Sequence, residues 1–482
     1  MFDILIKGGT IVDGSGAPGF TGDVAVQDGR IAAVGPAIAG EARRTFDATG
    51  RIVAPGFIDP HTHFDVQLLW DGAARPALEH GITCVVPGNC SLSLAPLKAA
   101  DRKGLVGMFQ QIEEMPPEAF TEAFDWTWED FAGYRDAIAK TLQLNAAPLV
   151  GHSVIRLWVM GADAQKRAAR PDEIAGMQDL LRQCLEAGAV GLSTSFVDVD
   201  ENGHPVPSRF ASFDELDALC AVLGERGRML QIVPEFYATD ITLARIDQLA
   251  ELSVKHAIPT TFSPLFDNNG TPDNAPRALA RVEEQFARGA RVWPQMQTRP
   301  IDISFSLLRP SLFFSRLPRW VRVLRLPLAE RLAALTNPAI ADKMVEDAGP
   351  DGGLAMMGEL VLRGGDAAPA ALAGRTLADI AAERGEGPAL EAAVKKITAD
   401  TAEIWGLKDR GLLQEGKAAD IVVFDADTIG RGEERPQFDM PGAGMRYVRD
   451  AIGIEAVVVN GQMAWEGGAY TDARAGVVCE LA

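Results

Sequence analysis

The middle of this chain alternates short apolar runs with amphipathic segments, and no other feature of the sequence constrains its fold as strongly. The runs are nearly continuous in apolar residues, as strands buried on both faces of a sheet should be. The segments between them, such as PDEIAGMQDLLRQCLEAG, place apolar residues at helical spacing and end at or near a glycine. This regular alternation predicts a parallel sheet covered by helices.

Seven of these strand–helix units can be counted up to about Arg299, whereas a closed (β/α) barrel needs eight. The strand candidates are the run that ends at His61, then ITCVVPGN, APLVGH, AVGLSTSF, MLQIVPEF, IPTTFSPLF and RVWPQMQTRP. Only GELVLRG at 358–364 remains as a further strand before the last helical segment. We therefore predict a TIM-type barrel across 56–409 that is irregular or open at its last strand.

The two ends of the chain have a different pattern. Both alternate apolar and polar residues between glycine-bearing turns, in DILIKGGTIVDGSG near the start and in GKAADIVVFDAD near the end. A chain of 482 residues is also too long for one ordinary core. We predict that 1–55 and 410–482 pair into one small β-sandwich beside the barrel, since close termini around an inserted domain are common.

Composition excludes several classes of protein. Hydrophobic residues make up 47% and charged residues 23%, as in a globular chain. A net charge of −20 repels phosphate backbones and argues against nucleic acid as a partner. The opening MFDILIKGG lacks a basic n-region, and no apolar run reaches the length of a membrane span, so we expect a cytoplasmic protein. Five scattered cysteines without CxxC spacing indicate reduced thiols.

One segment departs from the acidic average. Residues 304–328, SFSLLRPSLFFSRLPRWVRVLRLPL, carry five arginines and no acidic residue. Basic amphipathic segments can lie on membranes, but three prolines interrupt any long helix here. We interpret the segment as a folded lid or a subunit contact inserted into the barrel, which leaves a homo-oligomer or a partner subunit open.

The motif GFIDPHTHFD at 56–65 carries the clearest chemistry. Residues i and i+2 of an extended strand share a face, so His61 and His63 direct both imidazoles the same way. At the C-terminal end of a barrel strand, two such nitrogens can reach one divalent metal ion. The alternative is a pair of polar residues leaving a strand, but the chain has only six histidines in all.

This motif, GxxDxHxH after a small β region, resembles the opening signature of the amidohydrolase superfamily. The likeness continues in FDVQLLWDG, HGITCVVPGNCSLSLAP, GHSVIRLWVMG, EAGAVGLSTSF and GLKDRGLLQEGKAADIVVFDADTI, which resemble the N-acyl-D-amino-acid deacylases, or D-aminoacylases. The resemblance covers nearly the whole chain. It implies a barrel beside a small β-sandwich, one or two divalent metal ions with zinc foremost, and hydrolysis of an amide bond.

The resemblance also implies ligands beyond the two histidines. The cysteine of the GNC motif ligates zinc in that branch, and here it is Cys90; its residue type alone leaves a ligand or a packed small side chain open. Active deacylases carry further histidine ligands on the fifth and sixth strands, but MLQIVPEF and TTFSPLF have none. Glu235 and Asp267 are the nearest substitutes, either as oxygen ligands or as ordinary loop carboxylates.

The family's general base is an aspartate after the eighth strand. Here LAGRTLADIAAERG leads into EAAVKKITADTAEIWGL without the expected strand between them. Asp366 in RGGD is a candidate, with a plain turn as the alternative. Without this base, hydrolysis loses a proton carrier worth on the order of 100- to 10,000-fold in rate.

Two other residues are candidates to contact a substrate. His152 follows a buried strand at the same end of the barrel, where it would contact substrate or metal. Arg299 closes VWPQMQTRP, where it would clamp a substrate carboxylate through two hydrogen bonds or form an ordinary ion pair.

We therefore expect a metal-dependent hydrolase of a non-peptide C–N bond in a small N-acyl amino acid or cyclic amide. His61, His63 and Cys90 would hold Zn²⁺. One alternative is a barrel enzyme with altered chemistry that needs a partner chain. Another alternative is a catalytically inactive homologue that binds a ligand. A measurement of the metal content of the purified protein would distinguish an enzyme from such a homologue.

Overall fold

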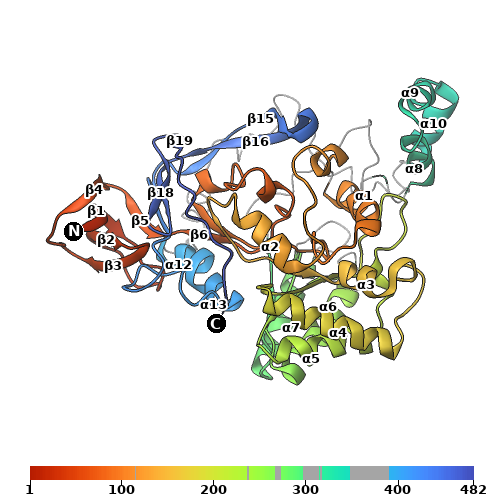
Figure 1. The fold of residues 1–482 in the computed structure, drawn as a ribbon, viewed down its shortest axis with the longest axis horizontal. Helices are drawn as coiled ribbons and strands as arrows, with labels where there is room; N and C mark the ends of the chain where they lie inside the picture. Colours follow the sequence, from red (N-terminus) through yellow and green to blue (C-terminus); the bar gives the residue numbers. More distant parts are fainter. Residues whose placement is uncertain are drawn as a thin grey trace.

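The computed structural model describes residues 1–113, 115–235, 238–265, 273–296, 314, 317–347 and 390–481. Figure 1 shows a β-rich part built from the red and blue ends of the chain, next to a larger part of parallel strands and helices. None of the described helices is long and apolar enough to cross a membrane.

The two ends of the chain meet in one nine-stranded sheet, ordered β19-β18-β17-β14-β5-β1-β2-β3 with β4 paired to β1. The strands are β1 (Phe2–Ile11), β2 (Phe20–Gln27), β3 (Arg30–Gly35), β4 (Ala42–Asp47), β5 (Ile52–Pro55), β14 (Ile421–Phe424), β17 (Ile454–Val459), β18 (Gln462–Glu466) and β19 (Ala469–Tyr470). Asp28-Gly29 and Asn460-Gly461 form two-residue turns in which both residues have positive φ, as type I′ hairpins require.

The two ends of the chain are joined by the antiparallel pairing of β14 with β5, in which Val422 lies opposite Ala54. Side chains from both ends, among them Ile4, Val53 and Ile421, share one apolar core. All nine strands belong to one hydrogen-bonded network, in which the first part of β1 pairs with β4 and its last residues pair with β5. The arrangement as a sandwich of two packed layers stays a prediction. The domain limits near 55 and 410 stay a prediction.

Eight short parallel strands form the framework of the larger part, in the orders β6-β7-β8 and β9-β10-β11-β12-β13. They are β6 (Phe57–Asp59), β7 (Ile82–Val85), β8 (Asn145–Ala146), β9 (Val150–Gly151), β10 (Gly191–Ser195), β11 (Met229–Val233), β12 (Thr260–Phe262) and β13 (Val292–Pro294). β8 and β9 are two pieces of one strand, because the N–H of Ala147 donates to Val85 O and the N–H of Val190 donates to Pro148 O.

The seven strand positions counted in the sequence are thus present and follow one another in chain order. The candidate for the eighth strand, GELVLRG, lies outside the described residues. Closure of the barrel therefore stays a prediction.

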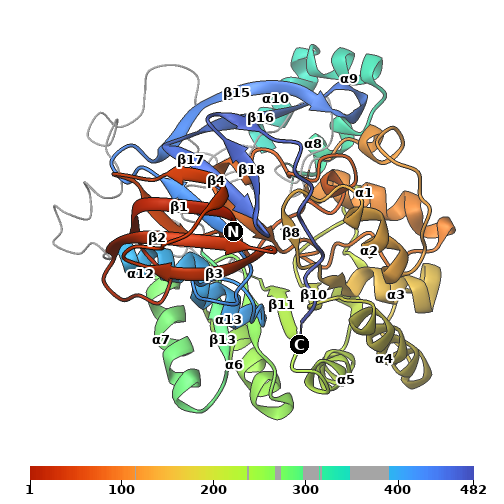
Figure 2. The same cartoon turned by 60° about the vertical axis from the view of Figure 1, so that its left-hand side comes forward.

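Helices cover the outer side of these strands (Figures 1 and 2). The connections from β9 to β13 contain α4 (Pro171–Glu186), α5 (Phe213–Gly224), α6 (Thr239–His256) and α7 (Asn274–Ala287), where helical spacing predicted them. Ser212 caps α5 by accepting from Glu215 N at 3.1 Å. The remaining α-helices of this part among the described residues are α1 (Arg102–Ile112), α2 (Phe131–Ala139), α3 (His152–Met160), α12 (Leu390–Lys395) and α13 (Thr401–Trp405).

The end of the basic segment and the residues that follow it form an arm of three helices at the edge of the molecule (Figure 1). These are α8 (Pro318–Leu324), α9 (Leu328–Leu335) and α10 (Pro338–Asp347). Val323, Ala334 and Met344 make a small apolar core of their own. The arm touches the barrel where Arg325 donates to Glu201 O at 2.9 Å. A lid or subunit-contact role for this segment stays a prediction.

Two segments near the C-terminus leave the sheet. β15 (Gly430–Met440) and β16 (Gly444–Ile452) form a separate antiparallel ribbon that reaches along the barrel part (Figure 1). The last residues also run against the barrel, where Cys479 N donates to Ala146 O at 2.7 Å. All five cysteines are free thiols, as their spacing predicted.

Candidate metal centre

His61 and His63 follow β6 at the C-terminal end of the parallel strands. Thr62 between them continues the strand, since its N–H and its hydroxyl both donate to Val86 O, at 3.1 and 3.0 Å. The extended backbone puts the two imidazoles close together, with ring centroids 5.5 Å apart and ring planes at 69°. The i, i+2 spacing thus brings both rings to one place, as the sequence predicted.

Cys90 comes from the turn after β7, and its Sγ lies 3.3 Å from His61 Nε2. One ligand atom from each of His61, His63 and Cys90 lies within 4.8 Å of the other two. Across the described part of the chain, this is the one group of three such side chains close enough to share a metal ion. The structure therefore brings together the three residues that the sequence singled out first.

The ring of His61 is oriented from the far end of the sheet. Its Nδ1 lies 2.5 Å from Oε1 of Gln295, just beyond β13. Because an amide oxygen only accepts, we assign the proton to Nδ1, so that Nε2 presents a lone pair toward Cys90. Burial, and then the neighbouring His63, lowers the pKa of His61 to about 4, which keeps the ring neutral at pH 7. Histidine binds metals in this form.

His63 offers a second nitrogen. Burial lowers its pKa to about 4, so the ring is neutral where its Nε2 lies 3.3 Å from Glu113 Oε1, and this contact is not an ion pair. Its Nδ1 is buried and has no hydrogen-bond partner among the described residues. Since such a nitrogen is costly to leave unsatisfied, this atom fits a bound cation.

Carboxylates surround the thiol of Cys90. Burial raises the pKa of this thiol well above its ordinary value, and the charges of Asp198, Glu113 and Asp65 raise it further. A divalent cation would offset both effects by stabilising the thiolate among negative charges. Two imidazoles and one thiolate are also a donor set that suits zinc. The residues present therefore fit a metal ion.

Sequence reasoning missed several polar residues here. Gln295 directly follows a strand, and Gln231 interrupts the apolar run MLQIV. Both could have been identified as candidates, because an amide side chain is unusual in a buried strand or directly after one. Glu113 follows a helix, α1, and carries no such signal. Asp65 stands inside the histidine motif itself, where burial raises its pKa to about 7. Its Oδ2 accepts from Gly88 N at 3.0 Å, while Oδ1 has no partner among the described residues.

His152 lies apart from this group. It is fully buried, and both ring nitrogens are engaged, Nδ1 with Thr194 Oγ1 at 3.0 Å and Nε2 with Glu215 Oε1 at 2.8 Å. Arg156, also fully buried, forms an ion pair with the same carboxylate. The geometry favours a structural role for His152 over the predicted contact with metal or substrate, because neither nitrogen is left to make one.

Glu235 also lies outside the group, and its carboxylate faces α6. It pairs with Arg245 through two hydrogen bonds of 2.7 and 2.6 Å. Burial raises the pKa of Glu235, but the hydrogen bonds and charge of Arg245 outweigh it and lower the pKa overall. This arrangement favours an ordinary ion pair over the predicted oxygen ligand. Asp267, Arg299 and Asp366 lie outside the described residues, and their roles stay predictions.

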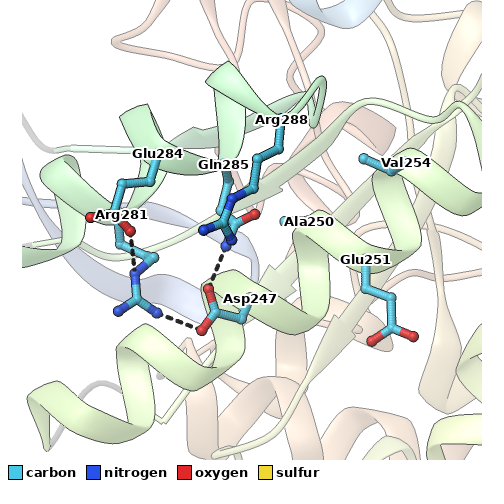
Figure 3. Close-up of a pocket in the computed structure, with 8 residues that line it drawn as sticks. All are labelled: Asp247, Ala250, Glu251, Val254, Arg281, Glu284, Gln285 and Arg288. Carbon is cyan, nitrogen blue, oxygen red and sulfur yellow. Dashed lines mark hydrogen bonds and ion pairs between the residues drawn. The ribbon is translucent and has the colours of Figure 1, made fainter.

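A pocket on the outer surface is separate from this centre (Figure 3). Its lining residues all come from α6, α7 and the residue that ends α7. Asp247 of α6 holds the two helices together by accepting from Arg281 at 2.5 Å and from Gln285 at 2.6 Å. None of the lining residues belongs to a strand end, so this pocket is no candidate for the chemistry of the histidines.

Comparison with known proteins adds independent information. The sequence profile described as "Amidohydrolase family" matches residues 44–227 and 333–464. The chain is 31% identical to the D-aminoacylase of Alcaligenes xylosoxydans xylosoxydans over 513 aligned positions, which cover 99% of this chain and 97% of that protein.

Two solved structures are similar over the same extent. One is a D-aminoacylase studied for the functional role of its binuclear metal center; it has a TM-score of 0.71 at 26% identity, with 100% of each chain covered. The other is N-acyl-D-glutamate deacylase from Bordetella bronchiseptica, complexed with zinc and a phosphonate inhibitor that mimics the tetrahedral intermediate of the reaction. It has a TM-score of 0.71 at 27% identity, with 99% of each chain covered.

Proposed function

The chain belongs to the amidohydrolase family, in its D-aminoacylase-like branch, and from this premise we propose that it hydrolyses the amide bond of a small N-acyl amino acid with the help of a divalent metal ion. It is an enzyme of the amidohydrolase type, with the α/β fold of a TIM-like barrel and a β domain. The observation that carries the proposal is the convergence of His61, His63 and Cys90 at the C-terminal end of the strands. Active sites of (β/α) barrels lie at that end.

We propose zinc as the ion, held by these three residues. When bound in such a site, a divalent ion polarises the scissile carbonyl group and activates water for attack. The chain's own residues prepare the site: burial keeps both rings neutral, and Gln295 fixes which nitrogen of His61 faces the ion. The negative surroundings of Cys90 favour a cation there.

Proton transfer needs a further group, for which we keep Asp366 as the proposal. A general base takes the proton from water and later protonates the leaving amine. Asp366→Asn decides this role. Activity lost with fold and metal content retained would make Asp366 the base, and unchanged activity would assign the step to another residue. In the same way, Arg299 stays a proposed clamp for the substrate carboxylate and Asp267 a proposed further ligand.

The proposed function is tested on protein purified without chelator. We expect at least one zinc ion per chain by elemental analysis, and release of free amino acid from a panel of N-acetyl-D- and N-acetyl-L-amino acids. His61→Ala should lose both. His256→Ala is the matched control, because His256 pairs with Asp217 at 2.8 Å at the end of α6 and should change neither.

The outcomes separate the alternatives. Protein without metal and without activity after zinc is added would favour an inactive ligand-binding homologue. Stoichiometric metal without hydrolysis of any N-acyl amino acid would favour altered chemistry or a requirement for a partner chain. The predicted cytoplasmic location is independent of both results and stays a prediction.

A further inference from the structure

We propose that Gln231 and Ser193 are positioning residues that hold the thiol of Cys90 at the metal centre. This inference rests on the proposed function, because it concerns how the chain presents one ligand of the proposed ion. The two side chains come from neighbouring strands, β11 and β10, where they are directly paired in register. Both are fully buried.

The turn that carries Cys90 has an unfavourable backbone. Cys90 has φ of 56° and Ser91 has φ of 66°, so two successive residues with a Cβ adopt the left-handed region. Each such residue is energetically unfavourable and persists only where the surroundings enforce it. Contacts from outside the turn must therefore stabilise this conformation.

Gln231 and Ser193 provide those contacts. The N–H of Cys90 donates to Gln231 Oε1 at 3.1 Å, and the N–H of Ser91 donates to Ser193 Oγ at 3.0 Å. The hydroxyl of Ser193 in turn donates to the carbonyl oxygen of Gly88. Ser193 thus ties the two ends of the turn to β10, while Gln231 holds the residue that carries the thiol.

The neighbouring chain leaves the turn little room to shift. A Cβ added to Gly151 would lie 2.4 Å from Ser91 O, and one added to Gly88 would lie 2.4 Å from Leu149 O. The backbone of the turn is therefore packed against the strand formed by β8 and β9. Ser153 of α3 also bonds to the hydroxyl of Ser91, at 2.8 Å. The hydrogen bonds from β10 and β11 are the ones that hold the backbone N–H groups of the two left-handed residues.

Gln231 does not touch the proposed ligand atoms through its own polar atoms. Its Oε1 binds the backbone of Cys90, and its Nε2 donates to Ile232 O at 3.0 Å. Loss of the acceptor would leave the part-buried N–H of Cys90 without its hydrogen-bond partner, which disfavours this backbone conformation. The turn would relax, and the thiol would move away from His61 Nε2.

The test uses full-length protein with Co²⁺ in place of zinc, because a cobalt–thiolate bond gives a charge-transfer absorption in the near ultraviolet that imidazole ligands do not give. We expect this band in the wild type and its loss in Cys90→Ser. Gln231→Met, which keeps the size of the side chain but removes the acceptor, should lose most of the band and bind Co²⁺ about 10- to 100-fold more weakly. Gln231→Glu keeps an acceptor and should retain the band.

Thr260→Val is the matched control. Thr260 is buried on β12 and donates to Arg291 O at 3.1 Å, so the variant loses a buried hydrogen bond without touching the turn. It should leave the band and the affinity unchanged. Should Gln231→Met fail to fold, Ser193→Ala gives the same test, since it frees the other N–H of the turn.

Each outcome supports or overturns a separate statement. A wild type that binds no Co²⁺ would overturn the proposed function and this inference together. The positioning role alone would be overturned if the wild type shows the thiolate band and a folded Gln231→Met or Ser193→Ala variant shows the same band and the same affinity for Co²⁺.

Discussion

Nδ1 of His61 and Oε1 of Gln295 lie 2.5 Å apart, although the two residues follow the first and the seventh strand of the parallel sheet. The strands therefore curve until the residues that follow β6 and β13 meet at the candidate metal centre. The contact also fixes the tautomer of His61, which leaves Nε2 directed at Cys90 Sγ.

Gln295→Met should weaken metal binding about 10- to 100-fold, because the ring of His61 loses the acceptor that orients it. Zinc affinity measured by competition with a chromophoric chelator checks this. Gln178→Met is the control, since Gln178 bonds to Ala218 O between α4 and α5 and should bind zinc like the wild type. Equal affinities for the two variants would contradict the role of Gln295.

Alkylation of the folded, metal-free protein should modify Cys90 alone. The other four cysteines are buried, whereas Cys90 is partly exposed. Burial raises the pKa of the Cys90 thiol, so the reaction of chelator-treated protein with iodoacetamide should be slow at pH 7 and faster as the pH rises. Bound zinc should protect the thiol. Mass spectrometry of tryptic peptides identifies the alkylated cysteine. If Cys184 or Cys220 reacts before Cys90, the expected order of exposure among the cysteines is wrong.

Glu215→Gln should destabilise the protein by about 3–5 kcal/mol, because it leaves the guanidinium of Arg156 buried without a counter-charge. Chemical unfolding followed by tryptophan fluorescence measures the loss. Glu225→Gln removes the partner of Arg182 from an exposed pair and should cost less than about 1 kcal/mol. Metal content of Glu215→Gln should equal that of the wild type. A large loss of metal with unchanged stability would instead place His152 at the metal.

Asp198→Asn should stabilise the metal-free protein above about pH 6. Burial raises the pKa of Asp198 to about 6, from an unfolded value of 3.8. A raised pKa means that the protonated carboxyl favours the folded state; this contribution is complete below pH 3.8 and is lost as the pH rises through 6. Asparagine cannot ionise, so it should avoid a loss of roughly 2–3 kcal/mol.

Unfolding midpoints of wild type and Asp198→Asn between pH 4 and pH 8 test this point. Their difference should grow up to about pH 6 and then level off. Asp240→Asn, at a carboxylate that is 90% exposed, should change stability by less than about 1 kcal/mol at every pH. Parallel profiles for wild type and Asp198→Asn would show that ionisation of Asp198 is not linked to folding.

Local features of the sequence were sufficient for the strands and for the pair of histidines. Helical and strand spacing depend on neighbouring residues, so seven strand positions and the helices between them could be predicted from periodicity. His61 and His63 share one strand end, and their relative placement follows from the two-residue repeat of extended backbone. The meeting of the two ends could be expected in outline from their similar patterns, but the direct pairing of β14 with β5 could not be predicted from the sequence.

Contacts between distant segments were decided by the tertiary structure alone. Gln295 is 234 positions from His61, and Gln231 is 141 positions from Cys90, so no local pattern links either pair. His152 shows the converse case. Its position after a strand predicted a contact with metal or substrate, but in the folded chain Thr194 and Glu215 engage its two ring nitrogens. Sequence spacing determines which way a side chain leaves its strand, whereas the stacking of strands and helices around it determines which atoms it meets.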